Sequence, residues 1–235
     1  MKLFKSKKVL TAFLSLLLVA TICAGLSYAF LFSTTAQYAN AFTPSENISA
    51  KLTEPNWNEE EGLQLVPGKV VRKDPMITNT CDIDEYVAIK ATFQRRGDDG
   101  KGSEISGADL RKLLDLLVID WNDTDWEIIE GDRDADPAEQ PFVFYYKGIL
   151  KPGQTTPPLF SSVRVKDQSD KLSEAQLRWL QGIKIEGGEI VPDPSGIGKF
   201  NIVLEGAAVQ AQGYANAQAA ANDLLALFLK PTATP

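Results

Sequence analysis

The sequence predicts a mainly β protein made of antiparallel strands with a few short helices. Apolar and polar residues alternate along several runs, most clearly from Tyr86 to Phe93, and a period of two is typical of a β-strand. Two such runs end in Pro-Gly pairs, at Pro67-Gly68 and Pro152-Gly153. These pairs favour tight turns, because proline presets φ and glycine accepts a positive φ. Runs with helical spacing are few and short.

The stretch from Ile48 to Phe93 indicates three strands joined by turns. Strand-like runs begin at Ile48 and at Leu63, and a further run follows the Pro67-Gly68 turn. In the run from Tyr86 to Phe93, the residues of one face are apolar: Val87, Ile89, Ala91 and Phe93. The other face mixes apolar and polar residues: Tyr86, Ala88, Lys90 and Thr92. This pattern predicts an antiparallel strand with one buried face.

The remaining elements are predicted from the residue spacings typical of strands and of helices. Helices are predicted where leucines or alanines recur at helical spacing: 106–117, 173–180 and 216–229. Strands are predicted where residues alternate or form apolar runs: 120–121, 126–129, 141–150, 159–165 and 199–210. The run 141–150 is apolar on both faces, so we expect it to be a central strand. In the last helix we expect one apolar stripe: Ala220, Leu224, Leu225 and Phe228.

Composition excludes several kinds of chemistry. The 235 residues include no histidine. This absence excludes zinc proteases with two histidine ligands, Ser-His-Asp and Cys-His hydrolases, and any imidazole acid-base step. The formal net charge is -7, so we expect no nucleic-acid partner.

The amino terminus has the three parts of an export signal. A basic stretch, Met1–Lys8, is followed by the apolar stretch Val9–Leu26 and by the small residues of Ser27-Tyr28-Ala29. This layout predicts a signal helix over 1–29 and cleavage between Ala29 and Phe30. The alternative is an uncleaved anchor, because 9–32 is uncharged and long enough to span a bilayer. Contact with a membrane is expected only through this segment.

The predicted mature chain starts with an unusual segment, 30–43. Its aromatic and aliphatic residues are spaced among small and polar ones: Phe30, Leu31, Phe32, Tyr38 and Phe42. The segment is β-prone, uncharged and free of proline before Pro44, which is the composition of a strand that pairs with a sheet edge. It is either a donor strand for another copy or the first strand of the chain's own sheet. A β-sandwich domain over 44–230 and a tail over 231–235 complete the predicted organisation.

Two acidic loops are candidates for metal binding, and neither has a recognised ligand pattern. Around Trp57, Glu59, Glu60 and Glu61 lie in a turn-rich loop, while Asp132, Asp134 and Asp136 repeat an acid at every second position. An EF-hand is excluded, because loop positions 6 and 12 hold Pro137 and Val143 instead of glycine and glutamate. We predict hydrated loops, no resident metal and no cofactor.

Removal of 1–29, with four lysines and no acid, changes the net charge of the chain from -7 to about -11.

Several motifs resemble the SipW-dependent exported proteins of Gram-positive bacteria, the TasA and camelysin family. They are Lys51-Leu-Thr-Glu-Pro-Asn-Trp57, Val66-Pro-Gly68, Lys73-Asp-Pro75, Thr78-Asn-Thr80, Asp82–Ile89, Leu150-Lys-Pro-Gly153, Thr156-Pro-Pro-Leu-Phe160 and Glu205-Gly-Ala-Ala-Val-Gln-Ala211. The resemblance covers most of the mature chain. Its motifs are turns and strand edges, which are specific for fold and weak for activity. One departure is Cys81, where the family pattern leads us to expect glycine or another small residue.

The resemblance implies a jelly-roll β-sandwich, export with cleavage by a dedicated signal peptidase, and assembly into biofilm fibres by strand exchange between copies. The donor strand would be 30–42. Camelysin relatives carry a metallopeptidase label, which we do not transfer, because a chain without histidine would have to build a zinc site from carboxylates and one thiol. We therefore expect a secreted structural protein that self-associates and has no catalytic residue.

Two alternatives come from other classes of protein. The first is a carboxylate-based hydrolase or an unusual metallopeptidase that uses the acidic loops. The second is a monomeric adhesin or carbohydrate-binding sandwich, with Trp57, Trp121 and Trp126 as stacking platforms. Tryptophan in a β-sandwich is more often part of the core than of a ligand site, so exposure of these rings separates the two possibilities.

Overall fold

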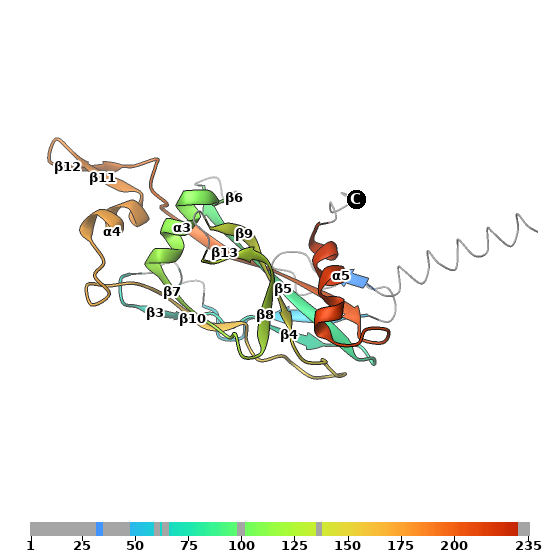
Figure 1. Ribbon diagram of the computed structural model, residues 1–235. Helices are drawn as coiled ribbons and strands as arrows, with labels where there is room; N and C mark the ends of the chain where they lie inside the picture. Colours follow the sequence, from blue (N-terminus) through green and yellow to red (C-terminus); the bar gives the residue numbers. More distant parts are fainter. Residues whose placement is uncertain are drawn as a thin grey trace, which may run out of the picture.

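The computed structural model describes residues 32–34, 48–58, 62, 66–97, 102–134 and 138–229 (Figure 1). Within these residues the protein is mainly β, and its strands pair antiparallel throughout. This confirms the predicted class. The predicted signal helix over 1–29 and the tail over 231–235 lie outside the described residues.

The larger layer is a sheet in the order β1-β13-β5-β9-β8, with β6 also pairing with β5. Its strands are β1 (Phe32–Thr34), β5 (Glu85–Arg96), β6 (Gly102–Glu104), β8 (Trp126–Asp132), β9 (Glu139–Tyr146) and β13 (Phe200–Gln210). The 141–150 run, predicted to be central, contributes most of β9, which lies between β5 and β8. The two longest strands, β5 and β13, pair along their whole length, from Phe200 opposite Arg95 to Gln210 opposite Glu85.

The second layer is made of shorter strands. They are β2 (Ala50–Thr53), β3 (Val70–Arg72), β4 (Met76–Asn79), β7 (Leu117–Trp121) and β10 (Phe160–Val165). β2 pairs with β4, and β10 pairs with both β3 and β7. Backbone hydrogen bonds continue the pairing between β3–β4 and the chain that leads into β10, for example from the Leu159 amide to the Pro75 carbonyl (2.9 Å). Together these strands form one surface opposite the larger sheet.

The main core fills the space between the two layers. Trp121 of β7 stacks on Phe144 of β9 with ring centroids 4.9 Å apart, so aromatic rings from both layers are in contact. Phe93 and Phe142 meet edge to face and are fully buried. Leu110 and other leucines of helix α3 (Gly107–Leu116) are buried in this core, as the helical spacing predicted.

A second, smaller core lies on the outer face of the larger sheet, where helix α5 (Ala217–Leu229) packs. Leu224 of α5 and Ala88 of β5 are both fully buried there. The prediction that β5 has one buried face is therefore wrong, because a helix far along the chain covers the other face. The predicted stripe of α5 is partly right: Ala220 and Leu224 are buried, while Leu225 and Phe228 are only partly buried.

A hairpin and a short helix extend from one end of the layers (Figure 1). Helix α4 (Glu174–Gln181) begins at Ser173 with a capping box and ends at Gly182 in the left-handed conformation. Strands β11 (Ile183–Glu186) and β12 (Glu189–Pro192) follow and pair across the Gly187-Gly188 turn. α5 and β1 lie toward the other end of the molecule (Figure 1).

Candidate functional site

The strand edge formed by β13 is the candidate functional site, because the only described part of the 30–42 segment pairs there. Phe32 lies opposite Val209, Ser33 opposite Ala208 and Thr34 opposite Ala207. Within the described residues, β1 lies at the edge of the sheet and forms three residue pairs with β13, which is 11 residues long. The other predicted assembly residues, Phe30, Leu31, Tyr38 and Phe42, and the cleavage residue Ala29, lie outside the described residues.

The part of β13 that pairs with β1 consists of buried residues with short side chains. Ala207, Ala208 and Val209 are fully buried, because the main core packs on one face of β13 and α5 on the other. Their small side chains let a further strand lie beside β13 without displacing either core. Among the described strands, none pairs with residues 200–205 on the side of β13 that faces away from β5.

An open cavity of about 420 Å³ lies where β13 ends. Its walls include Ile83, Tyr86, Ile149 and Tyr214, and Asp84 contributes the only carboxylate among the lining residues. Tyr86 and Tyr214 pack edge to face with centroids 6.3 Å apart, and the Tyr214 hydroxyl donates to Asp223 (2.6 Å). The lining of the cavity therefore combines two tyrosines with one acidic group. Sequence patterns did not reveal it, because its walls come from three separate stretches.

The corner before β5 contains a buried polar cluster. The Cys81 thiol lies 3.1 Å from Glu85 Oε1 and 3.0 Å from Asn79 Oδ1, and the Ser49 amide donates to the same Glu85 oxygen (3.2 Å). Glu85 is fully buried, and its Oε2 has no hydrogen-bond partner. Burial raises the pKa of Glu85 to about 7. Burial also raises the pKa of the Cys81 thiol, and the hydrogen bond from the thiol to Glu85 raises it further.

Cys81 was singled out as a departure from the family pattern, but the structure shows no backbone strain at this position. Its φ is not positive, so the corner does not require glycine. The thiol is half-buried and hydrogen-bonded within the corner. Its raised pKa keeps it in the less reactive protonated form at neutral pH.

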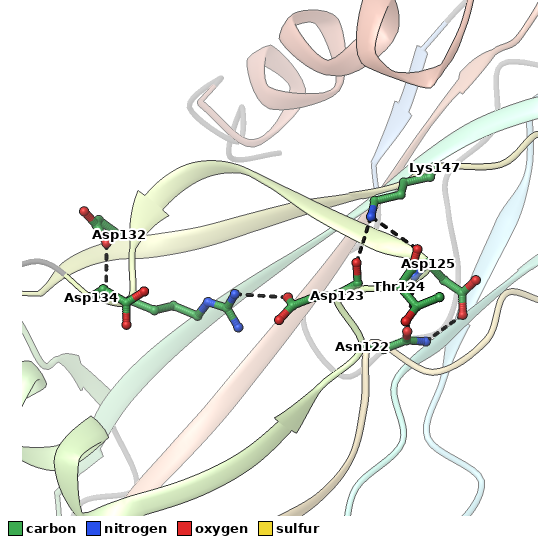
Figure 2. A network of polar contacts seen from close by, with 8 residues as sticks. Asn122, Asp123, Thr124, Asp125, Asp132, Asp134 and Lys147 are labelled. Atoms are coloured by element: carbon green, nitrogen blue, oxygen red, sulfur yellow. Dashed lines mark hydrogen bonds and ion pairs between the residues drawn. The ribbon is translucent and has the colours of Figure 1, made fainter.

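A polar network around the β7–β8 turn includes Asp132, one of the acids proposed for metal binding (Figure 2). Asp123 pairs with Arg133 (3.0 Å), and Lys147 donates to the backbone oxygens of Asp123 (2.7 Å) and Thr124 (3.2 Å). The side chain of Asp132 accepts from the Asp134 amide (2.8 Å), which makes a local turn. These contacts hold the β7–β8 turn against β9.

The described ranges contain no group of three or more acidic, cysteine or histidine residues that could hold a metal ion. Glu59, Glu60, Glu61 and Asp136 of the two acidic loops lie outside these ranges. In the same ranges, no helix has both the length and the apolar character needed to cross a membrane.

Two of the three candidate stacking tryptophans belong to the core. Trp126 is 1% exposed and its indole N–H donates to the Pro157 carbonyl (3.1 Å). Trp121 packs between Phe144 and Phe160. Trp57 is 37% exposed, and the Lys73 ammonium lies 4.5 Å from its ring centroid. A platform of three exposed rings is therefore absent.

Comparison of the chain with protein-family models, with curated proteins and with solved structures gave no significant match.

Proposed function

We propose that this protein is a secreted or cell-surface structural subunit that assembles into extracellular fibres by β-strand exchange. In this proposal, the signal segment directs export and a signal peptidase cleaves after Ala29. The strand in the β1 position then comes from a neighbouring copy. The two-layered β architecture is compatible with the jelly-roll topology that the resemblance to the TasA and camelysin family implies.

The observation that supports this proposal is the place of β1 at the end of the sheet order, where it pairs with β13 alone among the described strands. A strand at the end of the sheet order pairs on one side only, so a strand from another chain can take its place without breaking the pairing between the other strands. The same pairing can form between two copies, because strand addition uses backbone hydrogen bonds that are identical within and between chains. A head-to-tail contact of this kind produces a filament when the rotation between successive copies does not close a ring.

A mixing experiment with two single-cysteine proteins distinguishes exchange from pairing within one chain. One mature protein carries Phe32→Cys and the other carries Val209→Cys, both with Cys81→Ser as background. The two positions are opposite each other, at a separation that a disulfide can bridge. After mixing, assembly and oxidation, strand exchange predicts a disulfide between the two different proteins, seen by mass spectrometry of the band on a non-reducing gel.

The matched control replaces Val209→Cys by Asn201→Cys, which lies on the same strand and far from the register position of Phe32. This pair should not form the mixed disulfide. The pair Ser33→Cys and Ala208→Cys serves as a second register-matched test if the first pair folds poorly. A single chain that carries both cysteines of a matched pair measures pairing within one copy. If this chain forms an internal disulfide, while both mixed pairs give no more mixed disulfide than the control, β1 belongs to its own copy and the exchange proposal is wrong.

A further inference from the structure

The hairpin of β11 and β12 exposes two large apolar side chains side by side. Residues directly opposite each other across an antiparallel pair point to the same face, so Ile185 and Ile190 share one face with Ile183 and Pro192. Ile185 is 57% exposed and Ile190 is 72% exposed. Neighbouring apolar side chains on a surface mark an interaction site more often than single ones do.

The outer edge of β11 has backbone groups that point away from its partner strand. Both residues of the Gly187-Gly188 turn have positive φ, as in a two-residue type I′ turn, so Glu186 before the turn belongs to a hydrogen-bonded pair. Such pairs alternate with pairs that are not hydrogen-bonded, and the bond from the Asp193 amide to the Gly182 carbonyl (2.7 Å) agrees with this alternation. The N–H and C=O of Ile185 therefore face away from β12. Within the described residues, β11 pairs with β12 alone.

The charges beside Ile185 are self-complementary. Lys184 and Glu186 flank Ile185 and lie on the other face of the hairpin, with Lys184 Nζ 3.3 Å from Glu186 Oε1. When two copies of β11 pair antiparallel about Ile185, Lys184 of each copy lies opposite Glu186 of the other. Within one hairpin Glu186 is opposite Glu189, and like charges in this position are destabilising. A lysine on the free side of Glu186 offsets that repulsion.

We infer that β11 pairs with β11 of a second copy, in an antiparallel register centred on Ile185. The pairing is confined to 184–186, because α4 ends shortly before β11 begins. The two hairpins then form one four-stranded sheet, with the isoleucines 185 and 190 of both copies in a row on one face and two ion pairs between Lys184 and Glu186 on the other. Such a small contact is weak between two free molecules and strengthens when several copies are held together. It uses neither β1 nor β13, so it is separate from the strand exchange proposed above.

Disulfide formation between copies tests the register. Ile185→Cys, in the full mature chain with Cys81→Ser as background, places the thiols of two copies on directly opposite residues, at a separation that a disulfide can bridge. The matched control is Ile190→Cys, which lies on the same face and is more exposed, but is separated from its counterpart by both copies of β11. Under mild oxidation, Ile185→Cys should form covalent dimer several times faster than Ile190→Cys on a non-reducing gel. Equal or faster dimer formation by Ile190→Cys would reflect random collision of exposed thiols and overturns the inference.

Charge reversal in the Ile185→Cys protein tests the ion pairs. Lys184→Glu gives β11 two glutamates and Glu186→Lys gives it two lysines, so each variant alone should form about fivefold less dimer. An equimolar mixture of the two should form the heterodimer, identified by its mass, because each glutamate then lies opposite a lysine of the other copy. Mixing would not rescue dimer that was lost because the hairpin itself was damaged. A mixture that forms no more heterodimer than either variant forms homodimer alone overturns the inference, whatever the result of the cross-linking between β1 and β13.

Discussion

Glu85 is a carboxylic acid that the fold keeps away from water. It starts β5 as part of an otherwise apolar strand, with one oxygen accepting from the Ser49 amide and the other without a partner. Ser49 lies just before β2, the first strand of the second layer along the chain. The protonation state of Glu85 therefore bears on how firmly the start of β2 is held.

Glu85→Gln should change how stability depends on pH. The pKa of Glu85 is raised from 4.5 to about 7 in the folded protein, so folding favours the protonated acid. Its contribution to stability is fully present below pH 4.5 and is lost as the pH rises through 7. The linked loss is on the order of 3 kcal/mol, since one pKa unit corresponds to about 1.4 kcal/mol.

Urea denaturation of the mature protein under reducing conditions, at a series of pH values from 4.5 to 8.5, measures this effect. The wild type should lose stability relative to the Gln variant over this range. Asp84→Asn, which changes the neighbouring exposed acid, should keep the wild-type profile. If the free energy of unfolding depends on pH in the same way for wild type and Glu85→Gln, the pKa of Glu85 is not raised by folding. Glu85 would then be ionised in the folded protein at neutral pH.

At the scale of single elements, the N-terminal cap of α4 makes its own contribution to the free energy of unfolding. The Ser173 hydroxyl accepts from the Gln176 amide, and the Gln176 side chain accepts from the Ser173 amide. Ser173→Ala should lower the free energy of unfolding by about 1 kcal/mol. The matched control is Ser106→Ala, because Ser106 is the N-cap of α3 without a side-chain hydrogen bond, and its effect should stay within about 0.5 kcal/mol. Equal losses in both variants would contradict this account.

The packing of α5 against the outer face of the larger sheet contributes more to the free energy of unfolding than the cap of α4. Leu224 is fully buried between α5 and the sheet, whereas Leu229 is 66% exposed. Leu224→Ala should lower the free energy of unfolding by about 2–5 kcal/mol, through lost burial and the cavity left behind. Leu229→Ala should stay within about 0.5 kcal/mol. Chemical denaturation of both variants checks this, and a near-neutral Leu224→Ala would mean that α5 does not stabilise the sheet.

The elements themselves were largely predictable, because their signals are local. The helical spacing at 106–117 and at 173–180 and the Pro67-Gly68 turn each appear within a few residues, and the structure confirms all three. The two-sided burial of β5 was not predictable, because α5 follows it by more than a hundred residues. No local pattern indicates which helix covers which strand.

The candidate site was only partly predictable for the same reason. The composition of the 30–42 segment indicated a pairing strand, but its partner and register depend on contacts between distant parts of the chain. The buried Glu85 corner and the cavity beside it left no periodic signal. Glu85, an isolated acid at the start of an apolar strand, was the one sequence feature that pointed to the buried corner. From the sequence alone it cannot be distinguished from an exposed acid, because its burial depends on the second layer.

At the scale of the whole molecule, β1 lies at the end of the sheet order, where it pairs with β13 and also contacts α5. Strand exchange requires that the two layers and α5 stay folded when the strand in the β1 position is absent, since an unpaired subunit must persist until a neighbour arrives.

Proline substitutions in β1 test this requirement directly. Successive amides of a strand point to opposite sides, so of Ser33→Pro and Thr34→Pro one removes an N–H that faces β13. That variant should remain monomeric in sedimentation under conditions in which Ser33→Ala and Thr34→Ala form fibres. Its thermal midpoint should stay within a few degrees of the alanine variants, because about 1 kcal/mol of edge pairing shifts the midpoint of a domain of this size by roughly 2–4 °C. A proline variant that unfolds outright would place β1 among the elements that the fold needs, and fibres from both proline variants would show that assembly uses another surface.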